Sequence, residues 1–222
     1  MEKFDNSNKN LAEGDLHESC FHTKERKENT RFLAVLLCML IAFMGLRALW
    51  TQNFGGIVVD GASMNRTLSD GDMLLMRYTS AGAVAKRGDV IIVDVRGYLE
   101  CGEADFLIKR LIATEGDKVK CEDGKLYICY AGQSEYTYLE EDYAYYYLNK
   151  EDYDFGEYVV GKGEIFFLGD NRQNSKDSRY GEHGGSHLTN KLYKAEDIYG
   201  VVPSWAIEYK TALETVFFHN AK

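Results

Sequence analysis

The stretch VKCEDGKLYIC, residues 119–129, is the clearest fold signal in the sequence. Apolar and polar residues alternate on both sides of an Asp-Gly pair at 123–124, which is the pattern of a two-residue type I′ turn. If this pair forms the loop, Cys121 lies opposite Leu126 and not opposite Cys129. The stretch therefore predicts an antiparallel β-hairpin and disfavours a disulfide between its two cysteines.

Short apolar runs elsewhere also have the length of strands. Examples are IVV at 57–59, MLLM at 73–76 and VIIVDV at 90–95, and a Gly-Asp step stands directly before the second and the third. The chain has 21 glycines but 1 proline, so glycine, asparagine and aspartate must form most of its turns. We predict a mainly β domain built on antiparallel β-sheet.

A long apolar segment, FLAVLLCMLIAFMGLRALW, occupies residues 32–50 and is close to the roughly 20 residues that a helix needs to cross a bilayer. Its internal charge, Arg47, lies within a turn of Trp50, where the side chain can reach the membrane interface. A buried core helix and a cleavable signal peptide are the alternatives. No Ala-x-Ala site follows Trp50, which disfavours cleavage. We predict a single transmembrane α-helix that acts as an anchor.

The charges beside this segment predict its orientation. Basic residues crowd its N-terminal side at 24–31, whereas residues 51–60 contain no Lys or Arg, and basic flanks stay in the cytoplasm. Residues 1–31 carry few large apolar side chains, so we expect a disordered cytoplasmic tail. The expected organisation is this tail, the anchor at 32–50 and an extracytoplasmic domain at 51–222, in a single-pass protein of the cell membrane.

The composition excludes several classes of protein. With 45% hydrophobic and 13% aromatic residues, the chain is not globally disordered. A formal net charge of -9 argues against a nucleic-acid partner, because phosphate binding requires a concentrated positive field. Five cysteines without a CxxC pair are too few for a disulfide scaffold. We therefore expect an ordered exported domain without a disulfide framework.

An acidic, tyrosine-rich region at about 130–158 includes the run YAYYY at 143–147. It has no single period of a helix or strand, and we place it as a surface insertion packed on a sheet edge. Because tyrosine offers a flat face and a hydroxyl, a sugar- or peptide-binding platform is the alternative.

Ser63 is the candidate nucleophile. It lies in GASMNRTL at 61–68, shortly after the strand-like run IVV. A serine hydroxyl is a poor nucleophile at its own pKa and requires a base and an oxyanion site; without them the same residues would be a simple Gly-Ser turn. His183 and His187 could supply the base of a Ser/His/Asp triad, although nothing in their flanks places them beside Ser63.

Lys109 is the stronger candidate for the base. It lies in the apolar run ADFLIKRLIA at 104–113, where strand alternation puts Lys109 and Arg110 on opposite sides. If Lys109 points inward, desolvation lowers its pKa, and the neutral amine can accept a proton from Ser63. The alternative is an exposed strand lysine whose stem covers apolar surface.

An ordered set of motifs extends from the apolar segment to about Pro203. Its members are Gly61-Ala62-Ser63-Met64 with Thr67-Leu68, Gly71-Asp72, Arg87-Gly88-Asp89-Val90, Lys109-Arg110-Leu111-Ile112 with Gly116-Asp117, and Gly169-Asp170-Asn171-Arg172 with Asp177-Ser178-Arg179. In this order and behind an N-terminal anchor, the set resembles the bacterial type I signal peptidases, or leader peptidases, which are Ser/Lys-dyad serine endopeptidases. The resemblance implies that signal peptides are removed after small residues, typically Ala-x-Ala.

The resemblance also implies roles for residues in the reaction. Ser63 would be the nucleophile and Lys109 the general base, and Ser175 would hydrogen-bond and orient the lysine. The backbone N–H of Ser63 would donate to the oxyanion. Gly61 and Met64 would belong to the oxyanion site and the substrate cleft.

Two ion pairs would support this machinery, Asp170 with Arg110 and Asp177 with Arg179, by fixing the turn that carries Ser175. The resemblance further implies no metal and no organic cofactor. The expected partners are preprotein signal peptides, membrane lipid and the protein-export machinery, without nucleic acid.

Three positions depart from the family pattern. Arg66 and Glu115 stand where prolines are usual, and Gly61 stands where some members carry an oxyanion serine. Three rival functions compete with this interpretation. A self-cleaving repressor-type peptidase shares the Ser/Lys dyad, but the apolar span and the lack of a DNA-binding segment count against it. A penicillin-binding type requires Ser-x-x-Lys, whereas Met-Asn-Arg follows Ser63. A tethered binding module would use the tyrosine-rich insertion.

Overall fold

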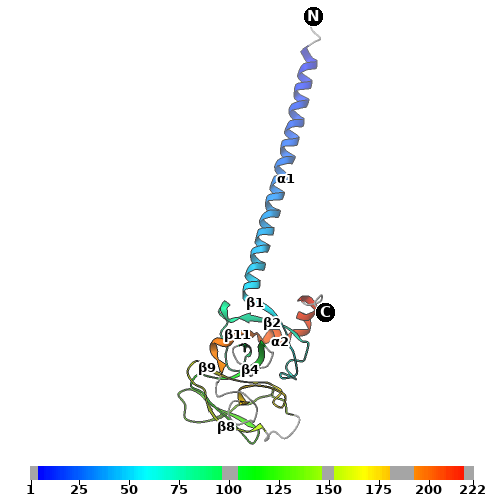
Figure 1. Ribbon diagram of the computed structural model, residues 1–222. Coiled ribbons are helices and arrows are strands. Elements are labelled where there is room, and N and C mark those ends of the chain that lie inside the picture. The colour runs from blue at the N-terminus through cyan, green and yellow to red at the C-terminus, as the bar shows by residue number, and fades with distance from the viewer. Residues whose placement is uncertain (1–4, 97–104, 147–152, 181–192, 218–222) are drawn as a thin grey trace. The chain divides into compact units, whose positions relative to one another are not determined.

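The computed structural model describes residues 5–96, 105–146, 153–180 and 193–217 (Figure 1). The chain divides into two compact units, Met1–Thr51 and Gln52–Lys222. The first unit is helical, and the second holds the β-sheets. Among the described residues, the protein is mainly β with antiparallel strands and one long N-terminal apolar helix, as the sequence predicts.

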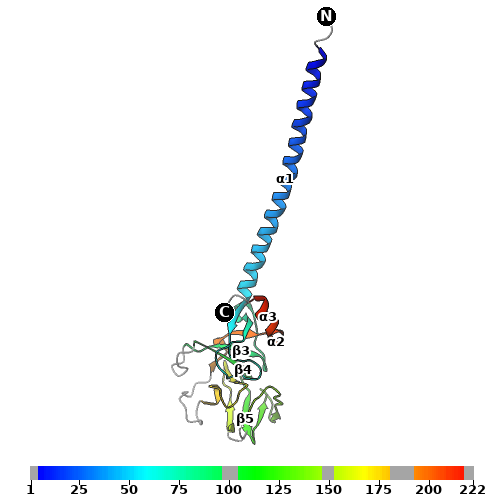
Figure 2. The ribbon, with the colours of Figure 1, turned by 90° about the vertical axis from the view of Figure 1, so that its right-hand side faces the viewer.

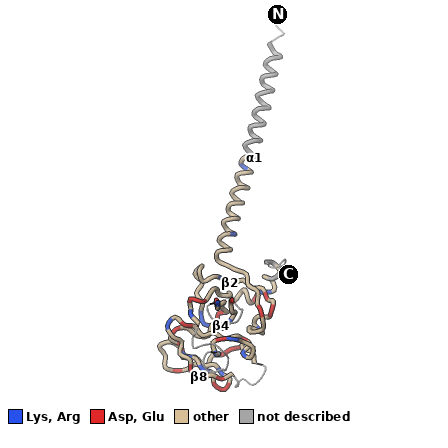
Figure 3. The backbone as a smooth tube through the Cα atoms, viewed as in Figure 1, with Lys and Arg blue, Asp and Glu red and all other residues tan. Residues whose placement is uncertain are grey.

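The long helix α1 runs without a break from Asp5 to Asn53. Its part Asn29–Asn53 contains an 18-residue window with a mean hydropathy of 2.4, none of which is buried, so by length and composition this part could cross a membrane. Figure 3 shows this part almost free of charged positions. Residues 5–31, which we expected to be disordered, are helical in the structure. Their Leu, Ala, Glu and Lys residues favour helix, and extending an existing helix avoids the cost of nucleation.

A seven-stranded antiparallel sheet, the larger sheet, forms the body of the second unit, in the order β1-β2-β11-β3-β4-β9-β10. Its strands are β1 Phe54–Val58, β2 Met73–Tyr78, β3 Val90–Asp94, β4 Phe106–Thr114, β9 Glu164–Leu168, β10 Tyr193–Lys194 and β11 Ile198–Val202. The central strands β3 and β4 are largely apolar and buried, as their Val, Ile and Leu content requires. The helices α2 Ser204–Glu208 and α3 Lys210–Phe217 follow β11.

A four-stranded antiparallel sheet, the smaller sheet, has the order β7-β6-β5-β8. Its strands are β5 Lys118–Glu122, β6 Lys125–Cys129, β7 Thr137–Tyr138 and β8 Phe155–Val159. Figures 1 and 2 both place this sheet on the side of β4 away from β1 and β2. Two of its strands, β7 and β8, come from the tyrosine-rich region, so that region extends a sheet instead of only covering one.

The predicted hairpin is confirmed by the register of β5 and β6. Cys121 lies opposite Leu126, and Cys129 lies opposite Lys118. Both cysteines are buried free thiols. The loop residues Asp123 and Gly124 have φ angles of 50° and 66°, the left-handed conformation that a type I′ turn requires.

Candidate active site

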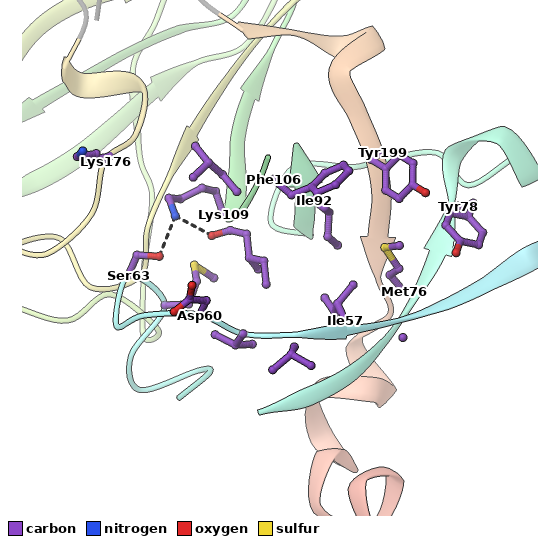
Figure 4. A pocket seen from close by; sticks show the side chains of 16 residues that line it. Ile57, Asp60, Ser63, Met76, Tyr78, Ile92, Phe106, Lys109, Lys176 and Tyr199 are labelled. Carbon is purple, nitrogen blue, oxygen red and sulfur yellow. Dashed lines mark hydrogen bonds between the residues drawn. The ribbon is translucent and has the colours of Figure 1, made fainter. Parts of the chain in front are cut away.

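A cleft of about 550 Å³ lies against β1 and β4 in the larger sheet. Its walls are mostly apolar and include Ile57, Val59, Ile92 and Ile108. Figure 4 shows Ser63 and Lys109 at one end of the cleft and Tyr78 with Tyr199 at the other. The polar end of an apolar, concave surface is where catalytic groups of an enzyme are expected.

Apolar neighbours in the chain hold the turn that carries Ser63. Met64 and Leu68 are buried in the core cluster that also contains Leu74 and Val90. The N–H of Leu68 donates to the carbonyl of Met64 at 2.8 Å, which closes one helical turn. Because both side chains are fixed in the core, the hydroxyl of Ser63 is left facing the cleft.

Lys109 reaches Ser63 from the middle of β4. Its Nζ lies 2.8 Å from Ser63 Oγ and also donates to the carbonyl of Ile108 at 2.9 Å (Figure 4). Lys109 is 2% exposed, so the inward orientation considered from the sequence is the one observed. Burial disfavours the charged form of an amine, and a neutral amine at this distance can accept the proton of a hydroxyl.

Both expected ion pairs are present and buried. Arg110 binds Asp170 through two hydrogen bonds of 2.8 and 2.6 Å, and Arg179 binds Asp177 in the same way at 2.8 Å. Burial raises the pKa of the Asp177 carboxyl, but the Arg179 charge, its hydrogen bonds and the N–H of Gly169 outweigh this effect and hold that pKa below its usual value. The two pairs therefore fix both ends of the turn after β9, which comprises residues 169–177.

Ser175 does not make the hydrogen bond to Lys109 that was expected of it. Its Oγ is buried and makes no hydrogen bond of standard geometry in the described structure, but it lies near enough to the Asp177 carboxylate to help lower the pKa of that group. The side chain packs directly against Gly169, where a Cβ atom would lie 2.2 Å from Ser175 Oγ. The turn thus directs this hydroxyl toward Gly169, while the amine of Lys109 donates to Ser63 and to Ile108.

Comparison with known proteins decides the family. A model of the signal peptidase family, peptidase S26, matches residues 30–205. The chain belongs to the signal peptidase family. It is accordingly a serine peptidase, a hydrolase.

Several relatives of this peptidase are bacterial. It is 36% identical over 170 residues to signal peptidase I of Bacillus licheniformis, a match that covers 70% of this chain and 81% of the relative. It is 33% identical over 174 residues to signal peptidase I T of Bacillus subtilis (strain 168), covering 72% and 80%. A crystal structure of a signal peptidase I from Enterococcus faecalis V583 has 27% identity, a TM-score of 0.39, and coverage of 55% of this chain and 98% of that chain.

Met64 and Gly61, which were expected at the oxyanion site and the substrate cleft, differ in burial and in their contacts. Met64 is buried and lines the cleft beside Ser63. Gly61 is exposed, has a φ of 87° and donates its N–H to Asp70 at 2.9 Å. Its N–H is therefore engaged in closing the turn before Ser63.

Several contacts of the peptidase site were not anticipated from the sequence. Thr67 donates to Asp170 at 2.6 Å, and Asn171 donates through its backbone to the Ser63 carbonyl and through its side chain to the Ala62 carbonyl, both at 3.0 Å. Thr67 and Asn171 both lie inside quoted motifs, but nothing in the motifs names their partners. They connect residues 61–68, which we call the serine turn, to the turn after β9.

The histidines of the rival triad, His183 and His187, lie outside the described residues, as does Cys101. Lys109 is therefore the candidate base whose geometry the structure describes.

Proposed function

We propose that this chain is a membrane-anchored signal peptidase I that removes signal peptides from exported preproteins through a Ser63/Lys109 dyad. The observation that carries the proposal is the 2.8 Å separation between Ser63 Oγ and the amine of a lysine that is 2% exposed. Family membership supplies the reaction class, since the relatives are named signal peptidase I.

In the acylation step, the neutral amine of Lys109 takes the proton of Ser63 as the hydroxyl oxygen attacks the carbonyl carbon of the scissile peptide bond. The negative charge that develops on the carbonyl oxygen is stabilised by the N–H of Ser63. The tetrahedral intermediate collapses when the C–N bond breaks and the Lys109 ammonium gives its proton to the leaving amine. The mature protein departs, and the signal peptide remains as an ester on Ser63.

In the deacylation step, Lys109 takes a proton from a water molecule, which attacks the ester carbon. Collapse of the second tetrahedral intermediate returns the proton to Ser63 Oγ and releases the signal peptide. One lysine thus acts as base and acid in both halves of the reaction, and no other proton carrier is required.

The substrate binds extended along the cleft, where its small side chains before the cut enter shallow apolar pockets. The apolar part of α1 anchors the enzyme in the membrane, with residues 1–31 in the cytoplasm and residues 51–222 outside. This orientation follows from the basic residues before the span. An anchor in the bilayer raises the effective concentration of a substrate that is held there as well, beside lipid and the export machinery.

The test is incubation of the full chain in detergent with a preprotein that carries an Ala-x-Ala site. We expect one new N-terminus directly after the second alanine, identified by mass spectrometry. A matched preprotein with Glu in place of that alanine should stay intact, because a charged side chain cannot enter a shallow apolar pocket without losing its hydration. Absence of cleavage, together with saturable binding of the same preprotein, would instead identify a tethered binding module.

A further inference from the structure

Residues 141–146, which we call the tyrosine segment, lie in the tyrosine-rich region and contact the turn after β9 through the main chain. The N–H of Tyr145 donates to the carbonyl of Asp170 at 2.7 Å, and the N–H of Arg172 donates to the carbonyl of Tyr145 at 3.0 Å. Tyr145 therefore pairs with Asn171 as an isolated parallel bridge. Asn171 also donates hydrogen bonds to the carbonyls of Ala62 and Ser63. It therefore connects the tyrosine segment to the serine turn.

Side chains reinforce this contact. Arg172 is 2% exposed and forms an ion pair with Glu141, and its Nη1 also donates to the Tyr146 hydroxyl at 3.0 Å. Burial favours the neutral form of Arg172, but Glu141 outweighs this effect and raises the pKa of that guanidinium above its usual value. A buried cation paired in this way fixes the tyrosine segment to the turn more firmly than main-chain contacts alone.

Two tyrosine rings of the segment lie against arginines that adjoin the dyad in sequence. The guanidinium of Arg66, three residues after Ser63, lies 4.3 Å from the ring centroid of Tyr145. The guanidinium of Arg110, directly after Lys109, lies 3.9 Å from the ring centroid of Tyr143. Arg66 has a φ of 70°, a conformation that a non-glycine residue adopts only when its surroundings hold it there.

We propose that the tyrosine segment is a positioning element for the dyad, with Tyr145 holding the serine turn through Asn171 and Arg66. The proposal rests on the proposed function for its rate readout. Displacement of Ser63 Oγ by a fraction of an ångström would weaken proton transfer to Lys109, because general-base catalysis requires hydrogen-bond distance. Tyr145 is not among the residues that line the cleft, so its effect should appear in kcat and not in KM.

The experiment compares three variants of the full chain in detergent, with a preprotein substrate. Tyr145→Ala keeps the main-chain bridge but removes the ring from Arg66, and we expect kcat to fall roughly fivefold while KM stays within about twofold. Tyr145→Phe keeps the ring face and should restore kcat. Tyr138→Ala is the matched control, because Tyr138 is a 52% exposed tyrosine of β7 in the same region, and it should behave like the wild type.

Amide hydrogen exchange of residues 62–68 gives a second readout that does not depend on substrate. Exchange should accelerate in Tyr145→Ala, and not in Tyr145→Phe or Tyr138→Ala. Faster exchange in Tyr145→Ala would support the positioning role even if the wild type cleaved no preprotein, which would refute the proposed function alone. Wild-type cleavage together with unchanged kcat and unchanged exchange in Tyr145→Ala would overturn the inference, as would a change in KM alone.

Discussion

The larger and the smaller sheet of the second unit contribute differently to the site. Lys109 lies on β4 of the larger sheet, and Ser63 follows β1 of that sheet. The chain that forms the smaller sheet supplies neither residue, yet the tyrosine segment lies between its strands β7 and β8. The proposed reacting groups therefore come from the larger sheet, and the segment that we propose as a positioning element comes from the chain of the smaller sheet, so mutations in each should have separable effects on rate and stability.

The largest effect should come from the larger sheet. Lys109→Met keeps the length and volume of the side chain but removes the base, so kcat should fall on the order of 10⁴-fold while the melting temperature does not decrease. Initial rates and thermal unfolding measure the two quantities. Lys118→Met on β5 is the matched control, and its rate should equal that of the wild type. Equal losses of kcat in both variants would contradict the assignment of the base to the larger sheet.

The next effect concerns the buried pair behind Lys109. Asp170→Ala leaves the Arg110 guanidinium buried without its carboxylate, which should lower the free energy of unfolding by about 3–5 kcal/mol. Denaturant unfolding measures this loss. The double variant Asp170→Ala/Arg110→Met should recover much of it, because no uncompensated charge remains. Wild-type stability in the single variant would show that the pair does not hold the turn.

Asp117 lies in the connection between β4 of the larger sheet and β5 of the smaller sheet, and it should make the stability of the fold sensitive to acid. Burial raises the pKa of Asp117, but hydrogen bonds from Arg87 and from the N–H groups of Thr114 and Ala131 outweigh it, and the pKa is lowered. A carboxyl whose pKa is lower in the folded state stabilises the protein above its unfolded-state pKa, and this stabilisation disappears as the pH falls through the folded-state pKa. Unfolding free energy should therefore decrease below about pH 4.

The variant Arg87→Met tests the origin of this acid sensitivity, because it removes the guanidinium and leaves the two backbone donors in place. The loss of stability between pH 4 and the lower pKa should be smaller in the variant than in the wild type. Identical pH profiles would show that Arg87 does not cause the acid sensitivity.

The smallest effect is expected at the tip of the smaller sheet. Asp123 has a φ of 50°, so Asp123→Ala should cost about 1 kcal/mol and lower the melting temperature by about 2–4 °C, without changing kcat. Asp123→Gly, which accepts this φ freely, should melt no lower than the wild type. A loss of kcat in Asp123→Ala would show that the hairpin tip, and not only the tyrosine segment, influences the dyad.

The success of sequence reasoning differed between these regions. The register of β5 and β6 follows from one Asp-Gly pair, because a two-residue turn allows a single pairing. The approach of Lys109 to Ser63 could be anticipated because the ordered motifs resemble those of the type I signal peptidases, whereas the apolar run alone also allows an exposed lysine whose stem covers apolar surface. These inferences depend on local pattern and on chemistry that few residue types can perform.

Other features could not be predicted in this way. The direction of the Ser175 hydroxyl depends on the path of an irregular turn around Gly169, which no period describes. The contacts of Glu141 and Tyr145 with Arg172 join segments about 30 residues apart, and no local pattern marks either partner. The helical conformation of residues 5–31 was not predicted because their scarcity of large apolar side chains favoured disorder, whereas extension of the apolar helix avoids the cost of nucleation.

The central claim is that Ser63 is acylated, and an acid-quenched turnover reaction tests it most directly. The full chain is mixed with excess preprotein, quenched within the first turnovers, digested and analysed by mass spectrometry. The account predicts an adduct of the signal peptide, less one water, on the fragment that contains Ser63, and no adduct or cleavage with Ser63→Ala. An adduct on another residue, or wild-type turnover by Ser63→Ala, would contradict it.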